Sequence, residues 1–558
     1  MRSSKSAAVA KAPPPLQTGA AKLADVKRLL EKLTLDLEKI CMLPHREQDV
    51  EVDVDSTRLT DTERDAALEQ LKLYGRDPVD AEPIFTREGI ETLTRHAFNS
   101  PSFTTSRNAL RCLANALLLR ASSRAMFVDL HYEMKLCQRL NNDNREDEFL
   151  VSRIIFLTTY GGNMDLENLI DNHHLAENIN NNIARHAKQY DEVQKIEKKE
   201  SDRSSASSMS TKDKDKREKK EKKAKEKESK KNAKMGPAEP TGPDPMEDMS
   251  LAETLKLLFN TTHFCRERAS YFVPAIPSIL RLLLKRAIDQ SAPMEPPTAQ
   301  LISALINLPL DLAESHLFPR SDPKMHVERL VNLLDIATAA YPERDLEQQV
   351  SPLLSVLRKV YAVAPRPVKV HLRVLLLPTA EDRLKPLGAT NTFSSRILKL
   401  SSSPLAPTAR EELSHLLFEM SDKDAKNFVQ NVGYGFASGF LFQNNVPIPE
   451  SALDAWSIND SASVGGRSSV GERSSSSSAR TFGMVGGKAV NPITGQTLES
   501  EEPWEGPKMT REEKEREAER LMVMFDRLQK NGIIKTENPM RTMQQEGRFE
   551  ELSDDDSS

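Results

Sequence analysis

Apolar residues return every three or four positions along most of this chain of 558 residues. The pattern fills the stretch from about Leu23 to Ile196, and it resumes in segments such as "AQLISALINLPLDLAESHLF" and "VSPLLSVLRKVYAVA". This spacing lines up apolar side chains on one face of an α-helix, whereas a half-buried strand needs strict alternation. Aromatic residues make up only 5% of the chain while Leu and Ala recur, which favours packed helices over β-sandwiches or barrels. We therefore expect an all-α protein.

The helical segments are numerous enough to form a repeat array. Without a Lys-rich stretch inside it, the span from Leu23 to Trp456 holds roughly 380 residues, and armadillo or HEAT units take about 40 to 47 residues each. That length accommodates about eight or nine units. We predict one armadillo/HEAT-like α-solenoid, with an N-terminal part over 21–194 and a C-terminal part over 249–457, preceded by a disordered N-terminus over 1–20.

Three stretches have a composition that opposes folding. Between Lys195 and Lys234 there are 17 Lys or Arg against 9 Asp or Glu and almost no apolar residues, so this stretch buries too little surface to offset its ordering entropy. We predict a disordered Lys-rich insert over 195–248, either a solvated loop or a contact for acidic lipid or nucleic acid. The Ser- and Gly-rich residues 458–509 are expected to form a flexible linker, and the acidic residues 533–558 a disordered tail.

One amphipathic helix is predicted between the linker and the tail, over 510–532, in "TREEKEREAERLMVMFDRLQKNG". Thr510 and Glu513 form a capping box at its start, and Asn531-Gly532 supplies its stop. An isolated helix of this length is only marginally stable in water, so its apolar stripe needs either this chain's own solenoid or the groove of a partner. Four residues at three- and four-residue steps form the stripe: Leu521, Met522, Phe525 and Leu528.

Three Leu-rich helical segments share one Asn near their end: Asn115, Asn260 and Asn307. On the inner helix of an armadillo unit, an Asn side chain can donate to and accept from the backbone of a bound peptide. The alternative is that these residues are helix C-caps, a position for which Asn is also suited. With Arg111, these three residues are our candidates for partner binding on the concave face of the solenoid.

The residue patterns of several chemistries are missing. The segment "FGMVGGKAV" departs from a phosphate-binding loop at Phe482 and Ala489. Neither the histidines nor the cysteines have the spacing of a zinc site, and no G-x-S-x-G elbow occurs. We expect no catalytic residue, no cofactor and no metal ion.

The sequence also indicates the compartment. The cysteines are far apart, which predicts buried thiols in a reducing environment, and they are Cys41, Cys112, Cys137 and Cys265. The N-terminus lacks the apolar core of a signal peptide, and no stretch approaches 18 uninterrupted apolar residues. The net charge of -5 gives no electrostatic case for nucleic acid. We expect a cytoplasmic protein.

The C-terminal region carries the most specific motif of the chain. The segment "NPITGQTLESEEPWEGPKMTREEKEREAERLMVMFDRLQKNGII" joins an NP-x-TG element to an M-T-x-E-E-K-E-x-E-A helix that ends in MFD-x-L. Together with "ALINLPL", "VLLLP" and "NVGYGFASGFLF", it resembles the synembryn family (resistance to inhibitors of cholinesterase) over nearly the whole chain outside the basic insert. The linker departs from that family, because "GGRSSVGERSSSSSAR" replaces an acidic, phosphorylated segment. Ser553 in "ELSDDDSS" is a candidate phosphorylation site, unless it belongs to a merely solvated acidic tail.

The resemblance implies a receptor-independent guanine nucleotide exchange factor and folding chaperone for heterotrimeric G-protein α subunits. In that family the concave face of the solenoid takes the C-terminal helix of the α subunit, and the terminal helix reaches its nucleotide-binding domain. We therefore expect a monomer that binds the GDP-bound and nucleotide-free α subunit and is recruited through it to the cell cortex. The alternatives are a passive armadillo-type scaffold, which would bind both forms of the α subunit equally, and a nucleic-acid adaptor acting through the Lys-rich insert.

Overall fold

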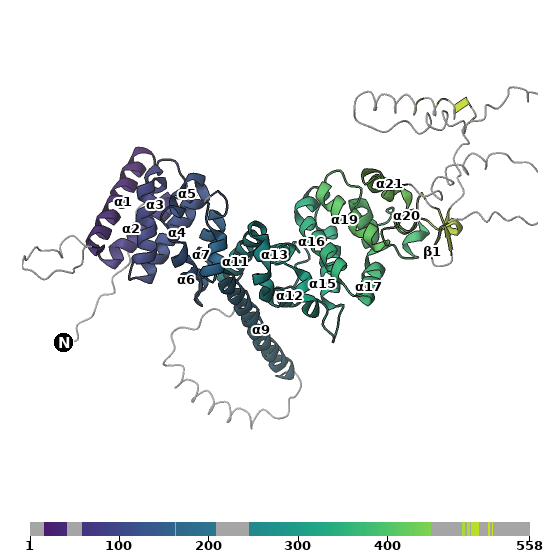
Figure 1. Ribbon diagram of the computed structural model, residues 1–558, viewed down its shortest axis with the longest axis horizontal. Helices are drawn as coiled ribbons and strands as arrows, with labels where there is room; N and C mark the ends of the chain where they lie inside the picture. Colours follow the sequence, from purple (N-terminus) through teal and green to yellow (C-terminus); the bar gives the residue numbers. More distant parts are fainter. Residues whose placement is uncertain are drawn as a thin grey trace, which may run out of the picture. The chain divides into compact units, whose positions relative to one another are not determined.

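Helices make up nearly all of the regular structure in the described part of this chain (Figure 1). The prediction of an all-α fold is thus confirmed. By its contacts the chain divides into two compact units, Met1–Glu499 and Ser500–Ser558. The computed structural model describes residues 16–41, 59–161, 163–207, 245–447, 483–485, 488–491 and 493–501, together with Thr510, Glu512, Glu513, Arg516 and Arg520.

A row of helices runs through the first unit, and each helix in the row packs on the next one. We call these the ladder helices. Because each one contacts its neighbours in the row, the arrangement is that of a solenoid, and the predicted architecture is confirmed. The ladder helices are α2 (Asp61–Tyr74), α4 (Phe103–Leu119), α7 (Arg145–Thr158), α11 (Pro245–Phe264), α13 (Thr298–Ile306), α16 (Glu343–Val363) and α19 (Pro407–Met420).

The first three ladder helices begin at a constant interval. Their first residues are Asp61, Phe103 and Arg145, so the step from the first start to the second equals the step from the second to the third. This interval falls within the about 40 to 47 residues of an armadillo or HEAT unit. A side chain before each helix accepts a hydrogen bond from a backbone N–H of the first turn, which fixes where the helix starts. These N-cap residues are Thr60, Ser102 and Asn144.

Polar contacts between neighbouring ladder helices repeat the same interval. Thr105 of α4 donates to Asp65 of α2 at 2.6 Å. One unit later, Arg107 of α4 donates to Asp147 of α7 at 2.9 Å. Residue 107 follows residue 65 by one interval, and residue 147 follows residue 105 by the same interval. The same two positions of the repeat thus join α2 to α4 and α4 to α7.

The other helices pack against the ladder helices, for example α3 on α4, α9 on α11, α12 on α13 and α15 on α16. Buried Leu, Ile and Val side chains between them form one continuous core from Val26 to Leu441. The remaining α-helices are α1 (Gly19–Cys41), α3 (Arg87–Asn99), α5 (Ala121–Val128), α6 (Glu133–Leu140), α8 (Leu166–Asn172), α9 (Leu175–Ser207), α12 (Ile276–Lys285), α14 (Glu314–Leu317), α15 (Met325–Ala340), α17 (Arg366–Leu376), α18 (Phe393–Leu400), α20 (Ala425–Val432) and α21 (Tyr434–Gln443). The 3-10 helices are η2 (Glu82–Phe85), η3 (Arg266–Ala275), η4 (Leu310–Ala313), η5 (Asp382–Leu384) and η6 (Leu498–Ser500).

Helix α9 extends past the boundary that the sequence predicts. The prediction ends the N-terminal part of the solenoid at 194, but α9 continues to Ser207. Lys, Glu and Ala are strong helix formers, so a helix nucleated by the packed residues before 194 propagates into the charged stretch. The rest of the predicted insert up to residue 244 lies outside the described residues.

Part of the predicted flexible linker over 458–509 packs on the solenoid. Strands β1 (Gly483–Val485) and β2 (Lys488–Val490) pair antiparallel, and Val490 is buried. The segment after β2 forms backbone hydrogen bonds with residues near η5 and α21. The Ser and Gly content predicts a flexible segment, but the contacts that hold this segment are made by backbone groups. Composition gives no information about such contacts.

The cysteine prediction is confirmed for three of the four residues, because Cys112, Cys137 and Cys265 are buried free thiols. Burial raises the pKa of Cys112 and of Cys137 to about 12, so both stay protonated at neutral pH. Within the described ranges, no helix combines the length and the apolar character needed to cross a membrane.

A buried cluster of charges joins α7, α9 and α11. The Nε2 atom of His186 on α9 lies 3.0 Å from a carboxylate oxygen of Glu148 on α7, and its Nδ1 atom contacts Glu247 on α11. Thr254 donates to Glu148 at 2.6 Å, and Arg185 pairs with the same carboxylate. Burial disfavours the charged imidazole, but the two carboxylates outweigh it and raise the pKa of His186 to about 8. The cluster thus holds together the two helices that flank the Lys-rich stretch.

This cluster makes stability depend on pH. A histidine whose folded pKa of about 8 exceeds its ordinary 6.5 stabilises the fold below pH 6.5, and the stabilisation is lost as the pH rises through 8. The lost amount is about 2 kcal/mol. Burial would raise the pKa of Glu148, but the hydrogen bond and charge of His186 outweigh it and lower that pKa. Glu148 therefore titrates at acidic pH, and its contribution to stability does not change between pH 6.5 and 9.

We predict that urea unfolding of the wild-type chain shows a fall in the free energy of unfolding of about 2 kcal/mol between pH 6.5 and 9. In the His186→Gln variant this fall should be absent, because the side chain does not titrate. If both proteins lose stability equally over this range, the cluster does not carry the predicted charge.

Candidate functional site

Aromatic side chains gather on the exposed side of α7 and α11. Phe156 and Tyr160 are four residues apart at the end of α7, with ring centroids 5.3 Å apart. Phe259 and His263 repeat this spacing at the end of α11, with centroids 6.1 Å apart, and Phe264 follows them. Residues four apart share a helix face, and α7 packs on α11, so the two groups of rings lie on neighbouring ladder helices. We call these five residues the aromatic stripe.

The two halves of the stripe are held together by polar contacts. Asn260 of α11 donates to the hydroxyl of Thr159 at 2.7 Å, and its amide oxygen accepts from the hydroxyl of Tyr160 at 3.3 Å. Asn260 is 3% exposed, while its partners Thr159 and Tyr160 are half-buried and exposed, respectively. These bonds fix the end of α7 against α11, and with it the position of the rings.

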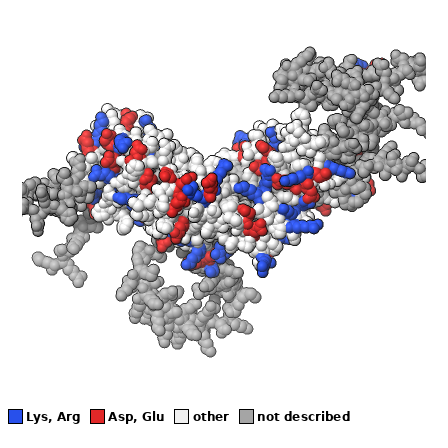
Figure 2. Space-filling view, in the orientation of Figure 1, with Lys and Arg blue, Asp and Glu red and all other residues white. Residues whose placement is uncertain are grey.

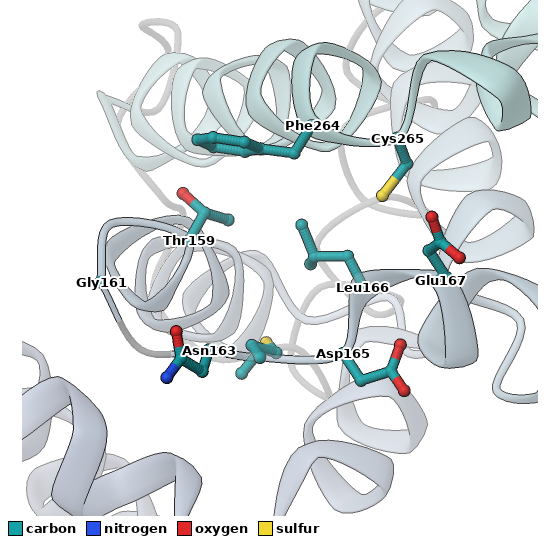
Figure 3. A pocket seen from close by; sticks show the side chains of 9 residues that line it. Thr159, Gly161, Asn163, Asp165, Leu166, Glu167, Phe264 and Cys265 are labelled. Atoms are coloured by element: carbon teal, nitrogen blue, oxygen red, sulfur yellow. The ribbon is translucent and has the colours of Figure 1, made fainter.

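A pocket opens beside the stripe, at the ends of the same two helices (Figure 3). Its volume is about 300 Å³. Figure 3 shows Phe264 and Cys265 on one side, with Thr159, Leu166 and Glu167 across from them. Two of the lining residues are carboxylates, Asp165 and Glu167, and Glu167 pairs with Arg268 at 2.9 Å. The pocket therefore suits a small polar or cationic group next to an apolar surface.

Basic side chains adjoin the stripe on its N-terminal side. Arg153 of α7 lies over the ring of Phe149 at 5.7 Å and pairs with Glu253 of α11 at 3.2 Å. One unit earlier, Arg111 of α4 pairs with Glu146 of α7. In both units an Arg of one ladder helix thus pairs with a Glu of the next. Across the face drawn in Figure 2, Lys and Arg are interspersed with Asp and Glu.

The aromatic stripe has the composition of a surface that binds another protein. Half-exposed aromatic residues are the side chains that anchor protein interfaces, since they bury a large area at a low cost in side-chain entropy. Tyr160 is 47% exposed and Phe264 is 51% exposed, so both present their rings to solvent. In the described part of the chain, no group of three His, Cys, Asp or Glu residues is arranged to hold a metal ion.

The four residues predicted for the concave face have different surroundings in the structure. Arg111 is half-buried in its ion pair with Glu146. Asn115 is half-buried on α4, and it has no hydrogen-bond partner among the described residues. Both remain candidates for a polar contact with a partner.

The other two residues take part in contacts inside the solenoid. Asn260 is buried within α11, one turn before its end, so it is neither a C-cap nor accessible to a partner in this structure. Asn307 is the C-cap of α13, and its side chain donates to the carbonyl of Phe259 at 3.2 Å. The C-cap interpretation thus fits Asn307, while Asn260 serves to position the aromatic stripe.

The predicted start of the terminal helix is present. The Thr510 N–H donates to the Glu513 carboxylate at 2.9 Å, and the Glu513 N–H donates to the Thr510 hydroxyl at 3.3 Å. These two bonds are the capping box, and residues 512, 513, 516 and 520 are helical. The predicted stripe and phosphorylation site lie outside the described residues, namely Leu521, Met522, Phe525, Leu528 and Ser553.

The aromatic stripe was not identified from the sequence. Its two halves are about 100 residues apart, and the Lys-rich stretch separates them. A signal does exist, because "IIFLTTY" and "LLFNTTHF" both place two rings four residues apart near a helix end, with a Thr pair between them. Comparing these segments as equivalent places in the repeat would have brought the rings together.

Comparison with known proteins supplies the family. A family model described as guanine nucleotide exchange factor synembryn matches residues 67–548. The Synembryn-like chaperone of Schizosaccharomyces pombe is 27% identical over 217 residues, which are 39% of this chain and 37% of that protein. Chaperone Ric-8A of Xenopus tropicalis is 26% identical over 332 residues, 57% of this chain and 56% of that protein. Chaperone Ric-8A of Gallus gallus is 23% identical over 495 residues, 84% of this chain and 81% of that protein. The matched part thus spans less than two thirds of the first two relatives and most of the third.

We predict different outcomes for two Asn→Ala variants. Asn260→Ala should lower the free energy of unfolding by about 1–3 kcal/mol, because it leaves Thr159 and Tyr160 without their buried partner. Asn115→Ala, the matched control, should change it by less than about 0.5 kcal/mol, because its side chain is half-exposed. Chemical denaturation of both variants measures the difference, and a negligible effect at Asn260 would refute its positioning role.

Proposed function

Because this chain belongs to the Ric8 family, that of the guanine nucleotide exchange factor synembryn, we propose that it is a receptor-independent exchange factor and folding chaperone for heterotrimeric G-protein α subunits. One observation carries the proposal. The family match spans residues 67–548, and so includes the aromatic stripe as well as the terminal segment 510–532. The names of the relatives Chaperone Ric-8A and Synembryn-like chaperone support the chaperone part.

Exchange of this kind requires no contact with the nucleotide. A ligand that binds the empty α subunit more tightly than the GDP-bound form must weaken GDP binding by the same factor, because coupling between two binding sites is reciprocal. The protein therefore acts as a binding partner, and no covalent step is needed. The same preference for a loosened α subunit would protect its folding intermediates.

The first proposed contact is between the aromatic stripe and a helix of the α subunit. An amphipathic helix laid along α7 and α11 would bury its apolar face on Phe156, Phe259 and Phe264. Arg153 precedes the stripe on α7 and Asn115 lies on α4, the ladder helix before it, so both could meet polar groups of that helix. The pocket lined by Asp165 and Glu167 would take a basic or hydroxyl group.

The second proposed contact is made by the terminal helix over 510–532. Its predicted apolar stripe needs a surface, and a second site on the α subunit would provide one. Two contacts joined by one chain hold the α subunit in a loosened state more tightly than either contact would separately. We further propose that the protein is a cytoplasmic monomer that reaches the cell cortex through the α subunit.

The proposal is tested by GDP release from a purified α subunit of the inhibitory class, lacking its myristoyl group, with and without this protein. Faster release, followed by a stable complex that GTP dissolves, is the expected result. If release is unchanged for several α-subunit classes but their yield in cell-free synthesis rises, the chaperone part alone is supported. Failure of both assays would favour the passive scaffold.

A charge placed in the aromatic stripe should weaken binding of the α subunit. Phe264→Asp is expected to lower affinity at least about tenfold, because a carboxylate would replace an anchoring ring in an apolar contact. Tyr271→Asp on η3 is the matched control, since Tyr271 is 56% exposed and Phe264 is 51% exposed. Binding is measured by titration calorimetry, and equal affinities of the two variants would exclude the stripe as the docking surface.

The terminal helix can be tested in the same way. Phe525→Asp should leave unfolding of the solenoid unchanged but reduce the rate of GDP release by about tenfold or more, because Phe525 lies in the apolar stripe. Val523→Asp is the control, because the 3.6-residue period places it on the opposite face. Exchange at the wild-type rate by Phe525→Asp would contradict the role of the helix.

A further inference from the structure

Residues 493–497 form a turn that is bound to the C-terminal end of the solenoid, and we call it the clip. It belongs to the stretch that the sequence predicts as linker, shortly before the terminal helix begins at Thr510. Backbone groups on both sides make three of the contacts. The bonds run from Leu387 N–H to Thr494 O at 3.0 Å, from Gly435 N–H to Ile493 O at 3.2 Å and from Thr497 N–H to Arg383 O at 2.9 Å.

The buried side chain of Arg383 binds the clip by a hydrogen bond. Arg383 is 2% exposed, and its guanidinium donates to the carbonyl of Gly495 at 2.9 Å and to that of Asn431 at 2.8 Å. The clip side chains are held too, because Gln496 donates to the Leu384 carbonyl at 3.0 Å and Thr497 is 5% exposed. A buried guanidinium bound to two carbonyls from separate segments makes this a built attachment point.

Two glycines make the close approach possible. Gly495 has φ +69°, and a Cβ atom there would lie 2.3 Å from the Cδ1 atom of Leu387. Gly433 has φ +80°, and a Cβ atom there would lie 3.1 Å from the carbonyl oxygen of Ile493. Other residues rarely adopt these backbone angles, so both positions favour glycine. Gly495→Ala is therefore the smallest change that should open the clip.

We propose that the clip is the anchor point of the terminal helix, so that it sets the length of the tether and thereby the effective concentration of that helix at the α subunit. This inference rests on the proposed function. With the clip closed, the tether is the short stretch from Thr497 to Thr510. Without any attachment after the last solenoid helix, the tether would start at Val446, whose N–H bonds to Leu441, and it would include the whole predicted linker. Strand β1 also contacts α20 and Val490 of β2 is buried, so a chain released from the clip alone would be tethered from about Val490.

The two tether lengths differ enough to matter. A tether from Val446 has about five times as many residues as one from Thr497, and a flexible chain has an r.m.s. length of about 5–6 Å times the square root of its residue number. The r.m.s. length is thus about 20 Å for the short tether and about 45 Å for the long one. Effective concentration falls with about the −3/2 power of the residue number, so it would be about tenfold lower for the tether from Val446. With the clip attached, the residues of the linker before the clip do not affect the effective concentration of the terminal helix.

The test is a matched pair of insertions in the full chain. The same Gly/Ser segment of about 50 residues, which behaves as a flexible coil, is placed either after Gly466, before the clip, or after Gly506, behind it. If the clip anchors the chain, the first insertion should not change the half-saturating concentration for GDP release, because the inserted segment lies outside the tether. The second insertion should raise the half-saturating concentration for GDP release about tenfold.

Glycine variants supply the second arm. Gly495→Ala should raise the half-saturating concentration about twofold, because the tether then starts near Val490, where β1 still contacts α20. Gly439→Ala on α21 is the control, because a Cβ atom there meets nothing within 4 Å. Hydrogen exchange reports the clip directly, since the amides of Leu387, Gly435 and Thr497 should lose protection in Gly495→Ala only.

The outcomes separate the tether from the exchange function. If the wild-type chain accelerates GDP release and both insertions raise the half-saturating concentration equally, the tether starts before the clip and the inference is overturned. If neither insertion has an effect, tether length does not matter and the inference is likewise overturned. If the wild-type chain does not accelerate GDP release at all, the proposed function fails and the tether role fails with it.

Discussion

The packing of each ladder helix on the next one determines where every other feature of this protein lies. The starts of α2, α4 and α7 are evenly spaced and each is fixed by an N-cap side chain, so equivalent residues recur in equivalent places. The Asp65–Thr105 and Arg107–Asp147 contacts show this register in polar groups. A single step of the same row, from α7 to α11, joins residues about 100 positions apart in sequence, because Tyr160 donates to Asn260. The aromatic stripe is thus a product of the repeat and not of any local motif.

The proposed mechanism needs two contacts made by one chain. The solenoid presents a rigid surface, since the stripe is held by Asn260 and by the charge cluster around His186 on the neighbouring helices. The terminal helix has a well-formed start in its capping box. Between them, the clip binds the chain to the end of the solenoid shortly before that start. A rigid surface and a short tether both reduce the entropy lost when the α subunit is bound.

The sequence predicts the features that depend on local periodicity. Helical spacing and unit length indicate the solenoid, and the Thr510–Glu513 pair indicates the helix start. It fails where the outcome depends on distant residues. Asn115 and Asn260 look alike in a Leu-rich helix, yet one is half-buried on α4 and the other bonds to the end of α7. The clip has no apolar period, because its binding comes from backbone groups that meet Leu387 and Arg383 far away in the sequence.

The most direct test of the account compares the affinity of this protein for the nucleotide-free and the GDP-bound forms of one α subunit, measured by surface-bound binding kinetics in the same buffer. Reciprocal coupling predicts at least about tenfold tighter binding to the nucleotide-free form, and an equal factor by which the protein weakens GDP binding. Equal affinity for the two forms would contradict the account, because a partner without such a preference shifts no equilibrium, and the protein would then be a passive scaffold.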